Sequence, residues 1–249
     1  MNATDDKPTR SLWRRLVTRI GKRVLHWYDR LQVRHSLIPT EPVLANELFD
    51  WVPRLEAAWP DIRAELDRVL ERPEEIPSFH QISPEQERIS KGNNWKTFGF
   101  FVFGTPVEEN CARCPRTVEA LRALPGLQNA MFSILAPRYH IPAHKGPTRA
   151  LLRCHLGLRV PRDAENCWIR VDDRICRWQE GKVLLLDDTY EHEVRNDTDE
   201  TRVVLFIDLD RPMDRFGNFC NQAIISLIRV SAFARKPLKN LKAWSRRPA

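Results

Sequence analysis

Residues 150–158 read ALLRCHLGL and alternate between two kinds of side chain. From position 152 the even-numbered residues are leucine or cysteine, whereas Arg153 and His155 fall on odd-numbered positions. Successive side chains of a β-strand point to opposite faces. The stretch therefore predicts a strand that packs one face on an apolar core and turns Arg153 and His155 together toward a different interior.

A second run, residues 202–208, reads RVVLFID and has the same character. Arg202 shares its predicted face with Val204, Phe206 and Asp208. Because a buried charge must be paired, an interior that accepts Arg153, His155 and Arg202 should hold an anion. The alternative is that these arginines lie at strand ends and reach water.

Short apolar runs separated by Gly, Pro or Asp-Asp surround these two segments. This punctuation is typical of an antiparallel barrel or sandwich. Helices are predicted within residues 42–75 and over 116–124, with a polar connection at 76–95. The further strands are predicted at residues 97–103, 129–135, 168–171, 174–178, 182–187 and 190–195.

Charge is distributed unevenly along the 249 residues, whose formal net charge is +7. Residues 1–38 contain nine Lys or Arg and three acids, and residues 211–249 contain nine and one. The body is therefore acidic and both ends are basic. We expect a basic N-terminal extension at 1–40, one catalytic-type domain at 41–213 and a basic helical tail at 214–249.

Both terminal segments have apolar residues at helical spacing among lysines and arginines, over 11–31 and 219–244. Such helices either pack on the domain or lie on an anionic membrane surface. No nucleic-acid motif accompanies the charge, so nucleic acid is not an expected partner. With neither a signal peptide nor a long apolar run, we expect a cytoplasmic protein, or one peripheral to the inner face of a membrane.

Two histidines lie in distinctive neighbourhoods. His144 opens His144-Lys-Gly146-Pro-Thr, and His192 follows an Asp-Asp pair by four residues. Two imidazoles can hold a ferrous ion, and an arginine such as Arg202 can hold a dicarboxylate. This is the chemistry of an oxygenase that uses Fe(II), 2-oxoglutarate and dioxygen.

At these residues the sequence resembles the aspartyl/asparaginyl β-hydroxylases and the related bacterial lipid A acyl-chain hydroxylases, from Trp95 to Met213. The resemblance implies a mainly β fold, a double-stranded β-helix (jelly-roll, cupin-like) barrel with flanking helices and basic amphipathic terminal segments. The strings that carry it are Cys114-Pro-Arg-Thr117, Phe132-Ser-Ile-Leu135, His144-x-Gly-Pro-Thr148, Leu152-Arg-x-His-Leu-Gly-Leu158, Trp178-x-x-Gly-Lys-Val183, Asp187-Asp-x-x-x-His-Glu-Val194 and Arg202 through Asp208 to Arg211-Pro212.

By the resemblance, His144 and His192 bind the iron. The usual non-haem iron triad has a carboxylate two residues after its first histidine. That position is Gly146 in this chain, so water is expected to take the vacant place.

The resemblance also implies the cosubstrate contacts. Arg202 and Ser133 would hold the distal carboxylate of 2-oxoglutarate, and Arg153 and His155 would contact its other end near the metal. Trp95 would line the pocket.

Several other residues could be mistaken for ligands. His140 precedes the first histidine by four positions and is interpreted as a loop residue. Asp187 and Asp188 are expected to bond backbone in the turn before the second histidine. Cys111 and Cys114 form a CxxC without a second Cys or His pair nearby, so no zinc is expected there.

These inferences favour a hydroxylase of an unactivated carbon, and most of all an aspartyl/asparaginyl-type β-hydroxylase of a protein or amino-acid side chain. The first alternative is a membrane-surface hydroxylase of a lipid acyl chain. It gains weight because Leu151 stands where the animal protein hydroxylases carry a basic residue, while the basic side chain here is Arg149. Further alternatives are a non-catalytic jelly-roll binding module and a membrane or nucleic-acid adaptor.

Overall fold

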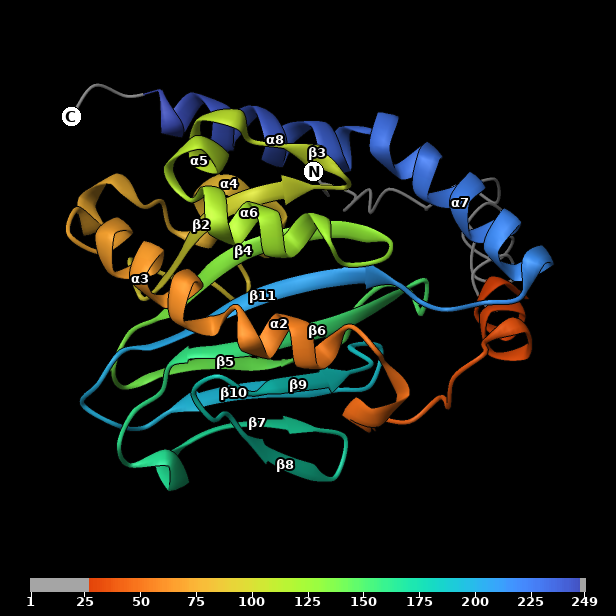
Figure 1. Ribbon diagram of the computed structural model, residues 1–249, viewed down its shortest axis with the longest axis horizontal. Coiled ribbons are helices and arrows are strands. Elements are labelled where there is room, and N and C mark those ends of the chain that lie inside the picture. Colours follow the sequence, from red (N-terminus) through yellow and green to blue (C-terminus); the bar gives the residue numbers. More distant parts are fainter. Residues whose placement is uncertain (1–26, 247–249) are drawn as a thin grey trace, which may run out of the picture.

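The computed structural model describes residues 27–246, and two antiparallel sheets form its centre (Figure 1). The predicted N-terminal helix over residues 11–31 lies mostly outside the described residues; residues 27–35 are helical. The larger sheet has the strand order β1 (Val43–Leu44), β9 (Val183–Leu186), β6 (Leu151–Arg159), β11 (Arg202–Asp210), β4 (Leu127–Leu135), β2 (Trp95–Val102) and β3 (Thr105–Pro106). The smaller sheet has the order β5 (Tyr139–His144), β10 (His192–Asn196), β7 (Cys167–Val171) and β8 (Arg174–Arg177).

The larger sheet separates two apolar cores, as the alternation in β6 and β11 predicts. Leu152 and Leu205 belong to the core that faces the helices. Val204 and Phe206 belong to the core between the two sheets. The predicted jelly-roll architecture and the strand parity are therefore confirmed, and the polar residues of β6 and β11 are turned into the space between the sheets.

Helices cover the outer face of the larger sheet and its edge (Figure 1). Residues of α2, α3 and α6 pack in the outer core, and α8 packs along the edge next to β2. From α8, α7 leads past the end of β11 to the helix at residues 27–35. The α-helices are α2 (Val52–Ala57), α3 (Trp59–Val69), α4 (Phe79–Ile82), α5 (Glu108–Arg113), α6 (Pro115–Arg122), α7 (Arg215–Val230) and α8 (Ala232–Ser245). Short 3-10 turns occur at Asn46–Leu48, Pro73–Glu75, Pro84–Gln86 and Ala164–Asn166.

Strand β5 departs from the sequence-based prediction, which left residues 139–144 outside the strands. The segment is short and contains Pro142, which is disfavoured inside a strand, and its pairing with β10 stabilises it. As a result His140 lies in a strand and not in a loop, with its Nε2 atom 2.8 Å from the Glu193 carboxylate. The predicted polar connection at 76–95 also contains α4, which begins with a capping box at Ser78.

No helix among residues 27–246 has the length and apolar character needed to cross a bilayer. All six cysteines are free thiols. The CxxC pair is buried, and the Cys111 thiol donates to the carbonyl of Phe100.

Gly157 provides a test of the packing between β6 and the turn before β9. A Cβ atom at this position would overlap the backbone carbonyl of Gln179. We expect Gly157→Ala to lower the free energy of unfolding by about 1–3 kcal/mol, because the backbone must move to relieve the overlap. Gly99→Ala is the matched control, since its Cβ would meet only the flexible end of Leu241. Denaturant unfolding of both variants checks this, and equal losses would contradict the explanation.

Candidate active site

The two predicted metal ligands lie opposite one another on neighbouring strands of the smaller sheet. His144 ends β5, His192 begins β10, and the two residues are register partners. Their ring centroids are 4.2 Å apart. The sheet pairing therefore brings together two histidines that are 48 positions apart in the sequence.

Backbone carbonyls fix the tautomer of both rings. The His144 Nδ1 atom lies 2.8 Å from the carbonyl oxygen of Pro142, and the His192 Nδ1 atom lies 2.9 Å from that of Tyr190. A carbonyl only accepts, so each Nδ1 carries the proton. The unprotonated Nε2 of each ring is then the atom that can bind a metal, with the backbone carbonyl as its outer partner.

The electrostatic surroundings keep both imidazoles neutral. Burial lowers the pKa of His192 to about 3, with further contributions from Arg153 and His144. Burial likewise lowers the pKa of His144. A metal-ligating histidine must be neutral, so both rings are prepared for that role at physiological pH.

Arg202 is a buried cation without a counterion. Only 2% of its surface is exposed, and no described carboxylate forms an ion pair with it. Its Nη1 donates to the carbonyl of Ser133 at 3.3 Å, its guanidinium lies 4.6 Å from the Trp178 ring, and its Nε is buried with no partner. Burial lowers the pKa of Arg202 to about 10. An isolated buried charge is costly, so this position favours an anionic ligand.

His155 offers a second unused donor in the same space. The Trp178 indole N–H can only donate, and it lies 3.2 Å from His155 Nδ1, which must therefore accept. The proton of the neutral ring is then on Nε2, a buried atom with no partner. Burial, together with Arg202 and Arg153, lowers the pKa of His155 well below its usual value. Two buried donors without acceptors fit a ligand that has carboxylate groups.

Ser133 and Trp95 complete this wall between the sheets. The Trp95 indole N–H donates to the Ser133 hydroxyl at 3.0 Å. The hydroxyl keeps its own proton for a further acceptor. Ser133 is the register partner of Val204, two residues after Arg202, so its hydroxyl belongs to the same region of the larger sheet.

Arg153 differs from Arg202 because its charge is already balanced. It pairs with Asp188 at 2.9 Å and with Asp208 at 3.1 Å, and its guanidinium lies 4.3 Å from the Phe206 ring. Although burial opposes it, these carboxylates hold the pKa of Arg153 above its usual value. Contact between Arg153 and a cosubstrate stays a prediction.

Asp187 and Asp188 each form an ion pair with an arginine, beyond the hydrogen bonds to the backbone of the turn that the sequence predicts. Asp187 accepts from the Thr189 N–H and hydroxyl, as predicted for a turn, but it also pairs with the fully buried Arg211. Asp188 was expected to bond backbone as well, and its side chain pairs with Arg153 instead. Burial raises the pKa of Asp188 to about 6, against the opposing effect of Arg153.

Gly146 allows this arrangement. A Cβ at Gly146 would overlap the Asp188 carboxylate, and the Gly146 N–H donates to the Asp188 carbonyl at 2.6 Å. The space that the usual triad carboxylate would need is therefore filled. Among the described residues, no three His, Cys, Asp or Glu side chains are grouped so that they could hold a metal, which leaves two histidines as the candidate ligands.

A largely apolar cavity of about 190 Å³ extends from Arg153 and Asp188 along the inner face of β2 and β4. Arg153, Asp188 and Asp208 line its polar end, whereas His144 and His192 do not line it. The rest is lined by apolar side chains from β2, β4, α4 and α8, among them Phe79, Ile82, Phe101, Met131, Pro237 and Leu241. The cavity could hold an apolar chain, and Arg153 at its polar end also helps to lower the pKa of His192.

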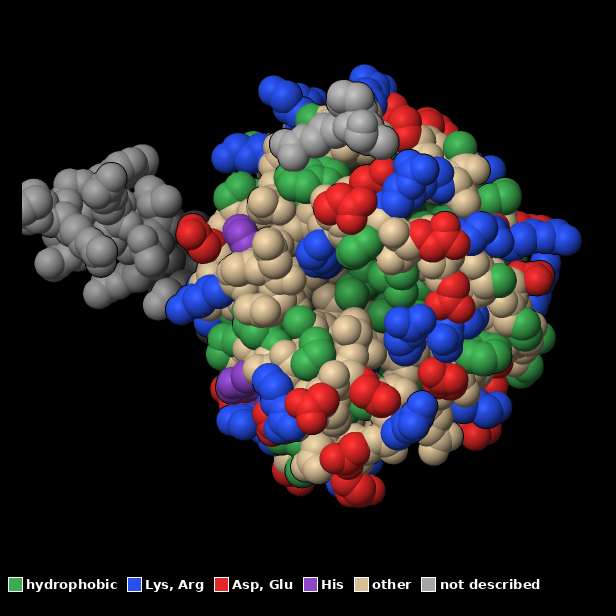
Figure 2. All heavy atoms as spheres, turned by 90° about the vertical axis from the view of Figure 1, so that its left-hand side faces the viewer, with side chains coloured by type: hydrophobic (Ala, Val, Ile, Leu, Met, Phe, Trp, Pro, Cys, Tyr) green, Lys and Arg blue, Asp and Glu red, His purple; other side chains and the backbone are tan. Residues whose placement is uncertain are grey.

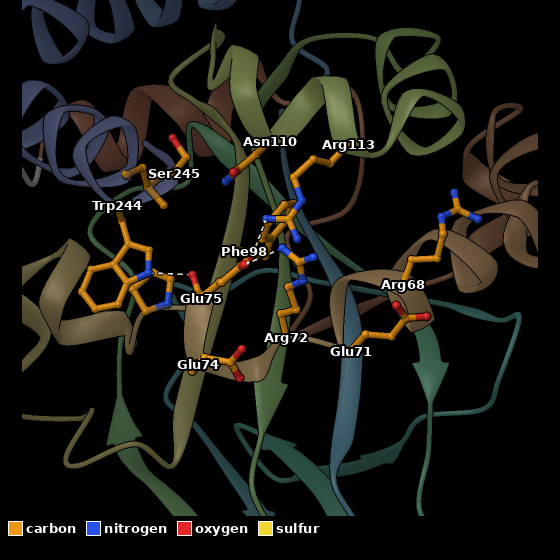
Figure 3. Close-up of a pocket in the computed structure, with 12 residues that line it drawn as sticks. Arg68, Glu71, Arg72, Glu74, Glu75, Phe98, Asn110, Arg113, Trp244 and Ser245 are labelled. Atoms are coloured by element: carbon orange, nitrogen blue, oxygen red, sulfur yellow. Dashed lines mark hydrogen bonds and ion pairs between the residues drawn. The ribbon is translucent and has the colours of Figure 1, made fainter. Parts of the chain in front are cut away.

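A larger cleft, of about 710 Å³, lies on the outer side of the molecule (Figure 3). The charges at its centre are paired. Glu75 pairs with both Arg72 and Arg113 at 3.1 Å, and the Trp244 indole N–H donates to the Glu75 carbonyl. Because it contains none of the predicted ligands and its central ions are paired, it is a less suitable catalytic site.

Trp178 is the residue whose contribution the sequence did not reveal. It follows β8 directly, and its burial depends on how the two sheets close. The same side chain fixes the tautomer of His155 and packs against the guanidinium of Arg202. The sequence pointed to this residue only through the string Trp178-x-x-Gly-Lys-Val183, which carries part of the family resemblance.

The sequence matches the aspartyl/asparaginyl β-hydroxylase family over residues 56–212, and the chain belongs to this family. It is 42% identical to an ornithine lipid ester-linked acyl 2-hydroxylase of Rhizobium tropici over 93% of this chain and 82% of that protein. It is 34% identical to the human aspartyl/asparaginyl β-hydroxylase over 65% of this chain but 21% of that protein. A Pseudomonas putida prolyl-4-hydroxylase superposes with a TM-score of 0.40 at 16% identity, over 61% of this chain and 87% of that one.

The unpaired charge of Arg202 predicts an unusual effect on stability. We expect Arg202→Met to raise the free energy of unfolding by about 1–4 kcal/mol in the absence of added ligands, because an uncompensated buried cation is replaced by an apolar side chain. Denaturant unfolding of the metal-free protein measures this. Arg211→Met is the control: Arg211 is equally buried but paired with Asp187, so its loss should destabilise. Destabilisation by both substitutions would indicate that Arg202 has a partner.

Proposed function

We propose that this member of the hydroxylase family is an Fe(II)- and 2-oxoglutarate-dependent dioxygenase that hydroxylates an acyl chain of a lipid. The observation that carries the cosubstrate assignment is the pair of buried donor atoms, Arg202 Nε and His155 Nε2, which have no acceptor among residues 27–246. A dicarboxylate supplies two anionic ends, one for each donor. The neutral, backbone-anchored His144 and His192 support iron as the metal.

The protein side chains have separable tasks in this proposal. Arg202, with the Ser133 hydroxyl, would hold the distal carboxylate, and His155 would donate to the other end of the cosubstrate. Trp178 positions both Arg202 and His155. When bound, iron and 2-oxoglutarate would together activate dioxygen, so that one oxygen atom is inserted into a C–H bond and the other enters the succinate that forms, with carbon dioxide, from 2-oxoglutarate. The apolar walls between the sheets would exclude water from this chemistry.

Two observations support an acyl chain as the substrate. The cavity that extends from Arg153 and Asp188 is lined mainly by apolar side chains. In addition, the acyl hydroxylase of Rhizobium tropici is similar over nearly the whole of both chains. An acyl chain is apolar and has only unactivated C–H bonds along its length, so it fits both the cavity and the proposed chemistry.

The basic side chain that could grip an acidic protein substrate is occupied elsewhere. Arg149 pairs with Asp29 at 2.9 Å, and its backbone N–H donates to Gln32. Leu151, which follows it by two residues, lines the apolar cavity. We therefore place the acyl chain ahead of the protein side chain that the sequence alone favoured.

The metal and cosubstrate assignments predict a spectroscopic signal. Anaerobic titration of the protein with Fe(II) and 2-oxoglutarate should produce a visible metal-to-ligand charge-transfer band, and His144→Ala or His192→Ala should abolish it. Arg202→Met should keep iron binding but require about 10- to 1,000-fold more 2-oxoglutarate, because a buried charged bond is lost. A folded protein without any band would support the non-catalytic jelly-roll module instead.

The cavity predicts a selective loss of substrate turnover. Met131 lines the cavity two residues from Ser133, and Met131→Trp would fill it. We expect at least about a 10-fold lower kcat/KM for a long-chain acyl lipid, with an unchanged charge-transfer titration, because a large ring in a packed site displaces the chain. Met131→Leu, of similar volume, is the control. Equal turnover by both variants would argue against the cavity as the acyl site.

A further inference from the structure

The outer face of α7 is an apolar stripe exposed on the described surface. Phe216 is 57% exposed, Phe219 73%, Leu227 68% and Val230 58%. With the exposed Ala223 they follow at intervals of three or four residues, which places them on one side of the helix. We call this set the α7 stripe.

The orientation of α7 is fixed by contacts on its opposite face. Asn221 is buried there, accepts from the Tyr28 hydroxyl at 2.9 Å and donates to the carbonyl of Ala150. A Cβ at Gly217 would overlap the side chain of His35, so α7 packs closely on the helix at residues 27–35. The α7 stripe therefore cannot turn inward without breaking these contacts.

The next helix, α8, carries a row of positive charge. Arg235, Lys239, Lys242 and Arg246 recur at intervals of four, three and four residues and line one shallow groove, and Arg246 is the member of this row that pairs with Glu109. The two helices adjoin along one edge of the molecule (Figure 1). By contrast, the face on the left of Figure 1 mixes Lys and Arg with Asp and Glu (Figure 2).

We propose that α7 and α8 dock on an anionic lipid bilayer, with the α7 stripe in the acyl boundary and the basic row of α8 at the phosphate groups. An amphipathic helix with a basic neighbour binds such a surface through its apolar area and its charge. Residues 211–249 contain nine Lys or Arg and one acid, which is complementary to anionic lipids. A second copy of this face, or residues 1–26 with seven Lys or Arg and two acids, would bring like charge to it.

The location of α8 connects the docking surface to the cavity. Pro237 and Leu241 of α8 line the apolar cavity described above. The helix that would contact the lipid surface therefore also covers the route along which an acyl chain would approach the metal site. Delivery of an acyl chain rests on the proposed function, whereas docking on the bilayer does not.

Cosedimentation of the full chain with vesicles tests the proposal. We expect binding to phosphatidylcholine vesicles that contain phosphatidylglycerol, and weaker binding to phosphatidylcholine alone. Phe219→Glu combined with Leu227→Glu should weaken binding about 10- to 100-fold, because two large apolar side chains no longer enter the lipid. Lys239→Glu combined with Lys242→Glu should remove the preference for phosphatidylglycerol. Ile175→Glu, at a 53% exposed apolar residue of β8, is the matched control and should bind as the parent chain does.

Other outcomes would overturn the proposal. If the Phe219 and Leu227 variant binds vesicles normally but melts at a lower temperature, the stripe is covered by residues 1–26. If that variant has a lower molecular mass in solution than the parent chain, the α7 stripe contacts a second copy of the protein. If the Ile175 control also loses vesicle binding, the weaker binding of the Phe219 and Leu227 variant is due to the added negative charge and not to the loss of apolar side chains. The charge-transfer titration is made on the same samples, so a failed oxygenase assignment is recognised separately from failed docking.

Discussion

The uncompensated guanidinium of Arg202 is the constraint around which the space between the sheets is built. It lies on a strand whose neighbours on the same face, Val204 and Phe206, are apolar, so the strand is buried on both sides. The Trp178 ring covers one side of the guanidinium, and the backbone carbonyl of Ser133 accepts a hydrogen bond from its Nη1. A fold that keeps such a charge without an anion loses stability, and the binding of an anion would restore it.

The contrast with Arg153 shows how charge is divided in this interior. Both arginines lie on inward faces of neighbouring strands, yet Arg153 is balanced by Asp188 and Asp208. The balanced charge can stay next to the histidines, where it helps to keep them unprotonated. The unbalanced charge lies against Trp178, in the other part of the site. Electrostatics alone therefore distinguishes a region suited to a metal from a region suited to a carboxylate.

The parity of β6 and β11 was predictable because one residue's shift would move every apolar side chain to the wrong face. The two histidines stand out by their local strings, but their proximity depends on β5, a short strand in which Pro142 is a residue that strands disfavour. The pairing of Asp188 with Arg153 and the burial of Trp178 join segments distant in sequence. Such contacts are decided by how the two sheets close, which local periodicity does not encode.

The packing of α8 on β2 shapes both the cavity and the outer surface of α7 and α8. Gly99 lacks a side chain where Leu241 of α8 approaches β2, so α8 can lie close to the sheet and form a wall of the cavity. With its inner side committed to β2, α8 presents its basic row outward. The preceding helix is held by Asn221, so its apolar stripe also points outward. The residues that wall the apolar cavity within the domain thus leave the α7 stripe and the basic row of α8 on its outside, where we propose that lipid binds.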